Sequence, residues 1–367
     1  MTGFAQIKQK LRGIFGGDLK ISSPGGPETY SIQRFGITAT CHRQWPTHTP
    51  FRDGWDRLSQ ICSHASTFSS RVWQTDGVGP TLRPGALRLI TATKGEELVA
   101  VLPMETTPTG FLESTGHAIS DYLDPLLDPT FERESWAAII ALLDELWDRE
   151  LKAITFHNIR HDSPCREILA SAAGNHGLTC DQTVVNNAAR IKLPATWDAY
   201  LESLDGHERK ELRRKIRKAQ EQAQARLSVM DGANWDDSRL AIAMDLIEAA
   251  EATKGEWFAM HVRPMLTHIA PTLAKEGRLR LQTLMINQTP AAALLEFPSP
   301  RGPLLYNSGY DPNQRQWSPG AVMFGLAIKD AIENSAQYFD LLRGREEYKN
   351  RLGAVDDSLF RISIHRP

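Results

Sequence analysis

The sequence predicts a mixed α/β protein built from two halves of similar length. Three observations support this fold class. Short β-rich runs alternate with segments of helical periodicity, the order helix–hairpin–strand–helix–strand is typical of mixed sheets, and 367 residues are enough for about two domains. The composition is that of an ordinary globular protein, with 41% hydrophobic and 23% charged residues.

In the first half, two β-rich runs at 87–92 and 98–102 flank Lys94-Gly95-Glu96, a hairpin signal. Apolar residues then recur at spacings of three and four from Trp136 to Trp147, which predicts a helix over 135–151. The remaining elements expected in this half are a strand at 153–159, a helix at 168–175 and a strand at 189–194.

The second half repeats this alternation of helices and strands. Its expected helices span 206–225, 237–251 and 320–334, and its expected strands span 279–286, 291–297, 304–310 and 338–342. We therefore expect a flexible leader over residues 1–28, one domain over 29–192 and a second over 193–367. An internal duplication fits this plan, although no residue-level repeat is visible.

Charge and cysteine content exclude several classes. The net charge of −2 carries no polyanion-binding signature, so no DNA partner is expected. No apolar run approaches the roughly 20 residues of a membrane-spanning helix, and the N-terminus lacks the h-region of a signal peptide. Four cysteines without CxxC spacing predict free thiols in the cytoplasm. No metal-ligand motif is legible, and His117, His157 and His161 are interpreted as core or surface histidines, so no metal is expected.

The leader permits two interpretations. Apolar residues from Phe4 to Phe15 fall near helical spacing with Lys8, Lys10 and Arg12 between them, which favours a basic amphipathic helix contacting a membrane surface or a partner such as a synthase. The alternative is a frayed leader before a Gly/Pro/Ser linker.

The segment 304–344 reads strand, polar loop, helix, strand. The helix is expected to begin at Ser318-Pro319-Gly320-Ala321, where proline suits the first turn and glycine permits close approach to the backbone. A helix start exposes unpaired N–H groups and the positive end of the dipole, so it is a candidate anion site, with Arg315 as an added contact.

This segment is one of several motifs that are spread over about 300 residues and together resemble a known family. They are "WDRL" at 55–58, "FSSRVW" at 68–73, "SDYLDPL" at 120–126, "TWDAYLESLDGHERKELRRKIRKAQ" at 196–220, "YDPNQRQWSPG" at 310–320 and "DLLRGREEYK" at 340–349. Their order resembles the CelD/BcsL group of acetyltransferases, which is associated with cellulose and exopolysaccharide synthesis. That group belongs to the GCN5-related N-acetyltransferase (GNAT) superfamily and is related to the Fem-type aminoacyl transferases.

The resemblance implies two GNAT-like domains in tandem with substrate in the cleft between them. It also implies acetyl-CoA or another acyl-CoA as co-substrate, with its pyrophosphate on the helix that starts at Ser318. One departure is Asn334-Ser335-Ala336, where the family often has glycine before the last strand.

Acyl transfer needs a base for the attacking amine or hydroxyl, and Asp340 is the candidate. Period-two alternation places Tyr338, Asp340 and Leu342 on one face of their strand, and a carboxylate on an apolar strand is costly unless it is paired or used. The alternative is a structural pair with Arg343, Arg345 or Lys349. Tyr306, Tyr310 and Tyr348 are candidate acids for the leaving thiolate, of which we favour Tyr310 and Tyr348, and a strand N–H is the candidate oxyanion donor.

Three further features are candidate substrate contacts. Arg209, Arg213 and Arg217 lie four apart on one helix and form a ridge suited to an anionic acceptor, although such ridges also occur as solvated surfaces. By resemblance to Fem-type proteins, Lys349 would contact a substrate phosphate; it would otherwise lie on a solvated face. Asp121 and Tyr122 belong to a turn that would either cap the chain or contact substrate.

The sequence thus predicts a cytoplasmic acyl-CoA-dependent N- or O-acyltransferase acting on a small or polysaccharide-related acceptor. The alternatives are a Fem-like transferase that uses aminoacyl-tRNA, disfavoured because aromatic residues do not interleave the basic helix, and a non-catalytic module that binds a sugar nucleotide or a synthase.

Overall fold

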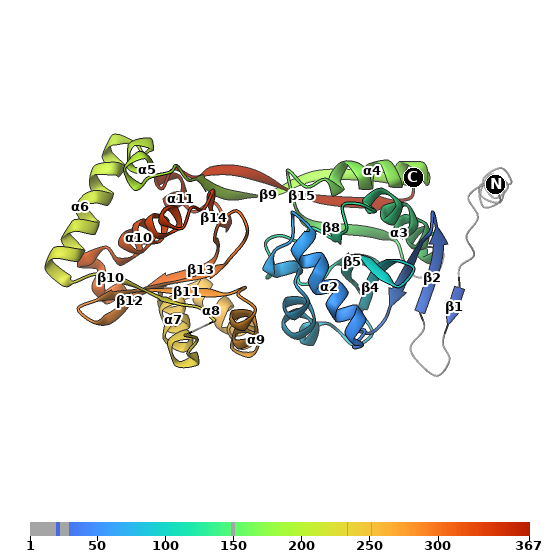
Figure 1. Ribbon diagram of the computed structural model, residues 1–367, viewed down its shortest axis with the longest axis horizontal. Coiled ribbons are helices and arrows are strands. Elements are labelled where there is room, and N and C mark those ends of the chain that lie inside the picture. Colours follow the sequence, from blue (N-terminus) through green and yellow to red (C-terminus); the bar gives the residue numbers. More distant parts are fainter. Residues whose placement is uncertain (1–19, 23–28, 148–150, 233, 251) are drawn as a thin grey trace. The chain divides into compact units, whose positions relative to one another are not determined.

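The computed structural model describes residues 20–22, 29–147, 151–232, 234–250 and 252–367 (Figure 1). The chain forms two compact units: Met1–Val185 together with Leu359–Pro367, and Asn186–Ser358. The predicted boundary at 192/193 lies close to the observed division, but the last residues of the chain belong to the first unit. The predicted leader, residues 1–28, lies outside the described residues except for one short strand, β1.

The first unit is built on a mixed sheet. Its strands are β1 (Lys20–Ser22), β2 (Thr29–Arg34), β3 (Ile37–His42), β4 (Leu87–Lys94), β5 (Glu97–Thr106), β6 (Phe111–Ser114), β7 (Leu126–Leu127), β8 (Ala153–Arg160) and the end of β15 (Val355–His365). The order is β1-β2-β3-β4-β5-β6-β8-β15, with β7 beside β5. All neighbours with a recorded register are antiparallel except β6 and β8, which are parallel.

Helices cover both faces of this sheet. They are α2 (Thr49–Ile61), α3 (Glu132–Trp147) and α4 (Cys165–Asn175), with short turns η1 (Thr67–Ser69), η2 (Trp73–Val78, a π-helix) and η3 (Gly79–Thr81). Neighbouring residues of β4 divide between the two sides: Leu89 packs in the cluster of Trp55 from α2, and Ile90 packs in the cluster of Trp136 from α3. The alternation of a strand therefore places α2 and α3 on opposite faces. The predicted hairpin is confirmed, with Gly95 at φ 61° between β4 and β5.

The second unit is a second mixed sheet. Its strands are β9 (Thr179–Lys192, from Asn186 onward), β10 (Arg226–Met230), β11 (Arg280–Ile286), β12 (Thr289–Phe297), β13 (Leu304–Tyr310) and β14 (Tyr338–Arg343). The order is β9-β14-β13-β12-β11-β10. The β13–β14 pair is parallel and the others are antiparallel.

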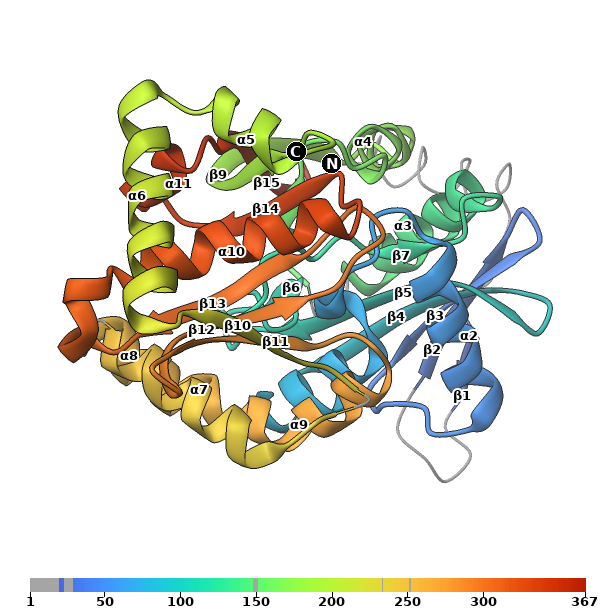
Figure 2. The same ribbon diagram turned by 60° about the vertical axis from the view of Figure 1, so that its left-hand side comes forward.

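Helices flank this sheet on two sides. They are α5 (Trp197–Ser203), α6 (Gly206–Ala223), α7 (Asp237–Ala250), α8 (Ala252–His261), α9 (Arg263–Lys275), η4 (Pro312–Trp317), α10 (Pro319–Glu333) and α11 (Glu347–Arg351). Figure 2 shows α10 and α6 on one side of the strands and α7 to α9 on the other. The apolar residues Leu212, Ala219 and Ala223 of α6 are buried, and the partly buried Ile216 packs against the same core cluster.

Gly325 lets α6 pack closely on the middle of α10. A Cβ there would lie 2.7 Å from Ile216 Cδ1 and 3.0 Å from Leu212 Cδ1, so the ends of these two side chains would have to shift.

Within the described residues, no helix combines the length and apolarity needed to cross a bilayer. The four cysteines, all of them described, are free thiols as predicted.

Candidate active site

The start of α10 is an open helix N-terminus. Ser318 precedes it with left-handed backbone angles (φ 52°, ψ 52°) and makes no side-chain cap. The first turn of α10, fully described, holds no acidic residue. The leading amides of a helix have no acceptor within it, so the N–H groups of Gly320 and Ala321 and the positive dipole end remain available to an anion.

Cationic side chains flank this helix start. Lys218 of α6 donates to the carbonyl of Gln316 at 3.0 Å and lies 5.2 Å from the centre of the Trp317 ring. Arg315 is exposed on η4. Two separate elements therefore carry positive charge close to this helix start, which favours a polyanion such as a diphosphate.

Strands β13 and β14 part on the way to this helix start. Along these fully described strands, the one register pair is Leu304 with Asp340. Tyr310, at the opposite end of β13 and about 20 Å away by strand rise, lies next to Gly320, where an added Cβ would be 3.6 Å from Tyr310 Cδ1. The strands are thus joined at one end and separate at the end where α10 begins.

A bulge interrupts β13 near the joined end. Leu295 of β12 faces Asn307, whereas the next residue, Glu296, faces Leu305, so an extra residue of β13 is inserted at Tyr306. A bulge turns a backbone amide out of the regular ladder. This supplies the kind of strand N–H that the sequence predicts as an oxyanion donor.

Of the two favoured tyrosines, Tyr348 contacts β13 through Ser308, whereas Tyr310 lies at the far end of β13, beside the start of α10. Tyr348 of α11 packs against Phe324 of α10, with ring centres 5.0 Å apart and an interplanar angle of 32°. Burial raises the pKa of its phenol, the charge of Glu346 raises it further, and a hydrogen bond with Ser308 of β13 lowers it in part. Tyr348 therefore keeps its proton at neutral pH.

Asp340 is buried at 5% exposure at the joined end of the strands. Its Oδ1 accepts a hydrogen bond from the N–H of Leu342 at 2.9 Å. Leu342 has φ 54°, and the pairing of β14 with β9 shifts register between Asp340 and Arg343. The regular alternation predicted for this strand therefore ends at Asp340, and Leu342 does not continue its face.

Lys349 is also buried, at 3% exposure. Its ammonium donates to the carbonyls of Leu341, Leu342 and Arg343 at 2.8–3.2 Å and pairs with Glu346 at 3.1 Å. These partners hold the turn between β14 and α11. The Lys349 ammonium therefore stabilises this turn through contacts within the protein, and no substrate phosphate is needed to account for its position.

The arginine ridge of α6 is largely exposed at Arg213 and Arg217 and half-buried at Arg209. Arg213 lies 3.6 Å from Asp198, a weak surface pair. The ridge can therefore receive an anion without losing a buried contact.

Asp121 and Tyr122 belong to the first unit and are 8% and 2% exposed. The adjacent Ser120 accepts from Trp73 Nε1 at 2.9 Å and, through its carbonyl, from Asn158 Nδ2 at 2.8 Å. These contacts are those of a buried structural turn.

The structure also brings together Glu113, His117 and His157 of the first unit, which the sequence analysis did not connect with one another. They come from three separate segments with no motif spacing, so no local pattern could have found them.

The comparisons with known proteins agree with this geometry. Residues 206–350 match the family model described as Acetyltransferase (GNAT) domain, so the second unit carries a GNAT-type acetyltransferase domain. No curated protein matches the sequence.

Two solved structures show the same fold over most of the chain. The crystal structure of FemX is 12% identical and has a TM-score of 0.59, with 87% of this chain and 96% of that chain covered. The C-terminal domain (DUF2156) of a putative lysylphosphatidylglycerol synthetase from Agrobacterium fabrum is 9% identical with a TM-score of 0.52, covering 86% and 92%. The predicted mixed α/β fold class is confirmed, and the family match lies in the second unit.

Proposed function

We propose that this chain transfers an acetyl or other acyl group from acyl-CoA to an amine or hydroxyl by direct attack on the thioester. The observation that carries the proposal is the open start of α10, with no side-chain cap and no acid in its first turn, at the end where β13 and β14 part. In acyl-CoA, the diphosphate and the thioester lie at opposite ends of the long pantetheine arm. The diphosphate would lie on Gly320 and Ala321, and the thioester would lie toward the joined end of the strands.

The proposed reaction needs a base, an oxyanion donor and an acid. Asp340, at the joined end, takes the proton from the acceptor as its nitrogen or oxygen bonds to the carbonyl carbon. An amide at the β13 bulge stabilises the oxyanion. When the C–S bond breaks, the thiolate takes a proton from Tyr348, whose raised pKa keeps the phenol protonated but makes it a weaker acid. Tyr310, beside Gly320 at the diphosphate end, is too far from the thioester for this role.

The acceptor is proposed to be anionic or sugar-linked. Its support is the exposed ridge of Arg209, Arg213 and Arg217, since guanidinium groups bind carboxylates and phosphates bidentately. A setting in cytoplasmic polysaccharide modification follows from the resemblance of the motifs to the CelD/BcsL group.

A second candidate is aminoacyl transfer from tRNA. The fold shared with FemX and the basic face of α6 favour it. It requires a nucleic-acid donor in place of acyl-CoA, so the two candidates differ in which molecule binds.

A thermal-shift titration distinguishes them. We expect acetyl-CoA to raise the midpoint of unfolding with saturation, because a ligand that binds the folded state stabilises it. Stabilisation by aminoacyl-tRNA with no response to any acyl-CoA would transfer the assignment to the second candidate. A response only to a nucleotide sugar would indicate a binding module.

A further inference from the structure

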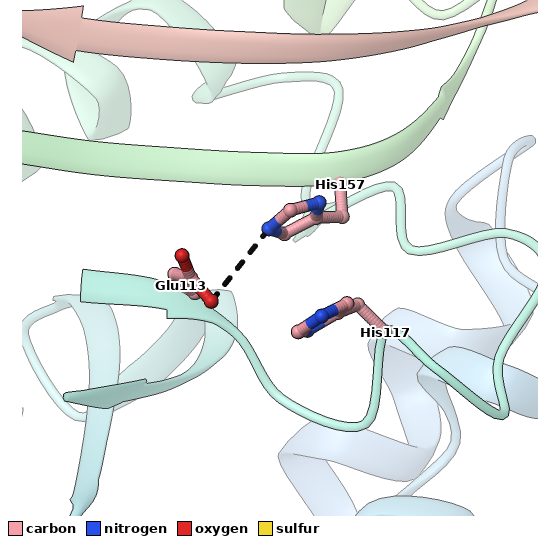
Figure 3. Close-up of side chains that lie close together, drawn as sticks. All are labelled: Glu113, His117 and His157. Atoms are coloured by element: carbon pink, nitrogen blue, oxygen red, sulfur yellow. Dashed lines mark ion pairs between the residues drawn. The ribbon is translucent and has the colours of Figure 1, made fainter. Parts of the chain in front are cut away.

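The first unit brings together two imidazoles and a carboxylate that the proposed reaction does not use. Glu113 lies on β6, His117 in the loop after it and His157 on β8 (Figure 3). One ligand atom from each residue lies within 4.8 Å of the other two. All three side chains are partly exposed, while His117 Nδ1 and His157 Nε2 are themselves buried.

The distances between these atoms fit a shared ion better than direct bonds. Glu113 Oε2 lies 3.9 Å from His157 Nε2, which is too long for a hydrogen bond. Two ligands of a tetrahedral zinc ion lie roughly 3.4 Å apart, given metal–ligand distances near 2.1 Å. A small contraction of the cluster therefore reaches metal-binding geometry.

The backbone around the cluster is held in place. Parallel pairing sets Glu113 of β6 opposite Thr155 of β8, and the N–H of His157 donates to Ser114 Oγ at 3.2 Å. Asn158 then donates through Nδ2 to the carbonyl of His117 at 3.2 Å. Asn158 itself has φ 56° and is 5% exposed. Asparagine adopts left-handed backbone more readily than most other residues with a Cβ, so it suits this position.

A second carboxylate adds negative charge beside the cluster. Glu105 of β5 is directly opposite Glu113 of β6 in an antiparallel pair, and like charges in that position destabilise a sheet. A bound cation would relieve this repulsion, which is a reason for two acids to face each other here.

From these observations we infer that Glu113, His117 and His157 bind a divalent transition-metal ion of the zinc class. Two imidazoles and one carboxylate are a ligand set that such ions prefer, and three protein ligands leave a position open for water or another ligand. The imidazoles are stacked at 4.2 Å between centres with a 15° interplanar angle. Because an ion lies in the plane of each imidazole that binds it, one ring, that of His117 in its loop, turns on binding.

The test uses the full chain, freed of any affinity tag, treated with chelator and titrated calorimetrically with Zn²⁺. We expect one ion bound per chain. His117→Ala and His157→Ala each weaken binding at least about tenfold, since even outer-shell changes cost that much. His161→Ala, which removes an exposed histidine just beyond β8, is the matched control and leaves the affinity unchanged.

A second readout uses Co²⁺, whose visible absorption reports imidazole coordination. The band should appear in the wild type and disappear in His157→Ala; if that variant fails to fold, the near-isosteric Glu113→Gln takes its place. Absence of saturable Zn²⁺ binding, or binding that survives both histidine substitutions, overturns the inference. Neither result bears on acyl-CoA binding in the second unit.

Discussion

At the scale of single residues, substitution can separate the hydrogen bond that Asp340 accepts from the role of general base that we propose for it. Asp340→Asn keeps an oxygen that can accept from the Leu342 N–H, so the bulge in β14 should survive, whereas the base is lost. We expect Asp340→Asn to lower kcat at least about 100-fold, the usual contribution of a general base, with an unchanged melting temperature. The measurement is steady-state acetyl transfer alongside calorimetric unfolding.

Asp340→Ala is the companion variant, because it removes both the base and the hydrogen-bond acceptor. It should lose turnover and also about 1–3 kcal/mol of stability, the cost of leaving a buried donor unsatisfied. If Asp340→Asn turns over like the wild type while Asp340→Ala is unstable, Asp340 serves only the bulge.

Glu296 of β12 makes the stability of the second unit depend on pH. It is fully buried, its Oε2 accepts from Gln282 Nε2 at 3.1 Å, and Arg280 at 3.8 Å is engaged more closely by Asp330 at 2.8 Å. Burial raises the pKa of Glu296 to about 8; Asp330 adds to the rise, and Arg280 and Gln282 oppose it. Above the ordinary pKa of glutamate the unfolded chain releases this proton and the folded chain retains it, so stability falls as pH rises from about 4.5 to about 8.

Glu296→Gln removes this dependence. We expect the variant to unfold at the same urea midpoint as the wild type near pH 4 and to be more stable by roughly 3 kcal/mol at pH 7. Urea titrations at several pH values measure the difference. Equal stability of the two proteins at every pH would show that Glu296 ionises normally in the folded chain.

Lys349 and Asp340 show how much of the candidate site could be predicted from its residues. The sequence predicts the strand that carries Asp340, and it shows that this acid lies on an otherwise apolar strand. It does not predict the hydrogen-bond partners, because the carbonyls that bind the Lys349 ammonium and the kink at Leu342 depend on a backbone path set by tertiary packing.

At the scale of the elements, the end of α10 explains the departure at Asn334-Ser335-Ala336. The N–H of Ser335 donates to the carbonyl of Ile332 and that of Ala336 to Ala331, which forms a Schellman motif. Ser335 has φ 59°, a conformation that favours glycine. Ser335→Gly should therefore stabilise the protein by about 1 kcal/mol.

Urea unfolding of Ser335→Gly measures this gain, and Ser335→Ala, which keeps a Cβ, should show none of it. A loss of stability on substitution to glycine would mean that the serine side chain contributes more than its strained backbone costs.

Elements with strong local signals were predictable within a few residues. The hairpin of β4 and β5 and the helix α10, expected at 320–334 and observed at Pro319–Glu333, are examples. β15 was not predicted, because its partner β8 lies almost 200 residues earlier and no local pattern encodes such pairing. The bulges in β13 and β14, which shape the candidate site, were missed for the same reason.

At the scale of the whole molecule, the end of the chain completes the first unit. Ile362 and Ile364 of β15 are 0% exposed in the cluster that includes Trp136 and Phe156, although the second unit precedes them in sequence. Ile362→Ala should cost roughly 2–5 kcal/mol, as for other large-to-small core changes. The exposed Arg361→Ala is the adjacent control and should change stability by less than about 0.5 kcal/mol.

Hydrogen exchange locates the damage. In Ile362→Ala, faster exchange should appear in β8 and α3 of the first unit, with α10 unchanged. Faster exchange confined to the second unit would contradict the assignment of these residues to the first.

The central claim is that the bare amides at the start of α10 receive the diphosphate of acyl-CoA, and a calorimetric comparison of two variants tests it most directly. Ala321→Glu places a carboxylate in the first turn, which favours the helix dipole but repels a bound anion. Thr272→Glu adds the same charge at an exposed position of α9. We expect Ala321→Glu to bind acetyl-CoA at least about tenfold more weakly than the wild type, a cost of about 1.4 kcal/mol, without losing thermal stability. Thr272→Glu should bind acetyl-CoA like the wild type. Equal affinity of all three proteins for acetyl-CoA would contradict the proposed diphosphate site.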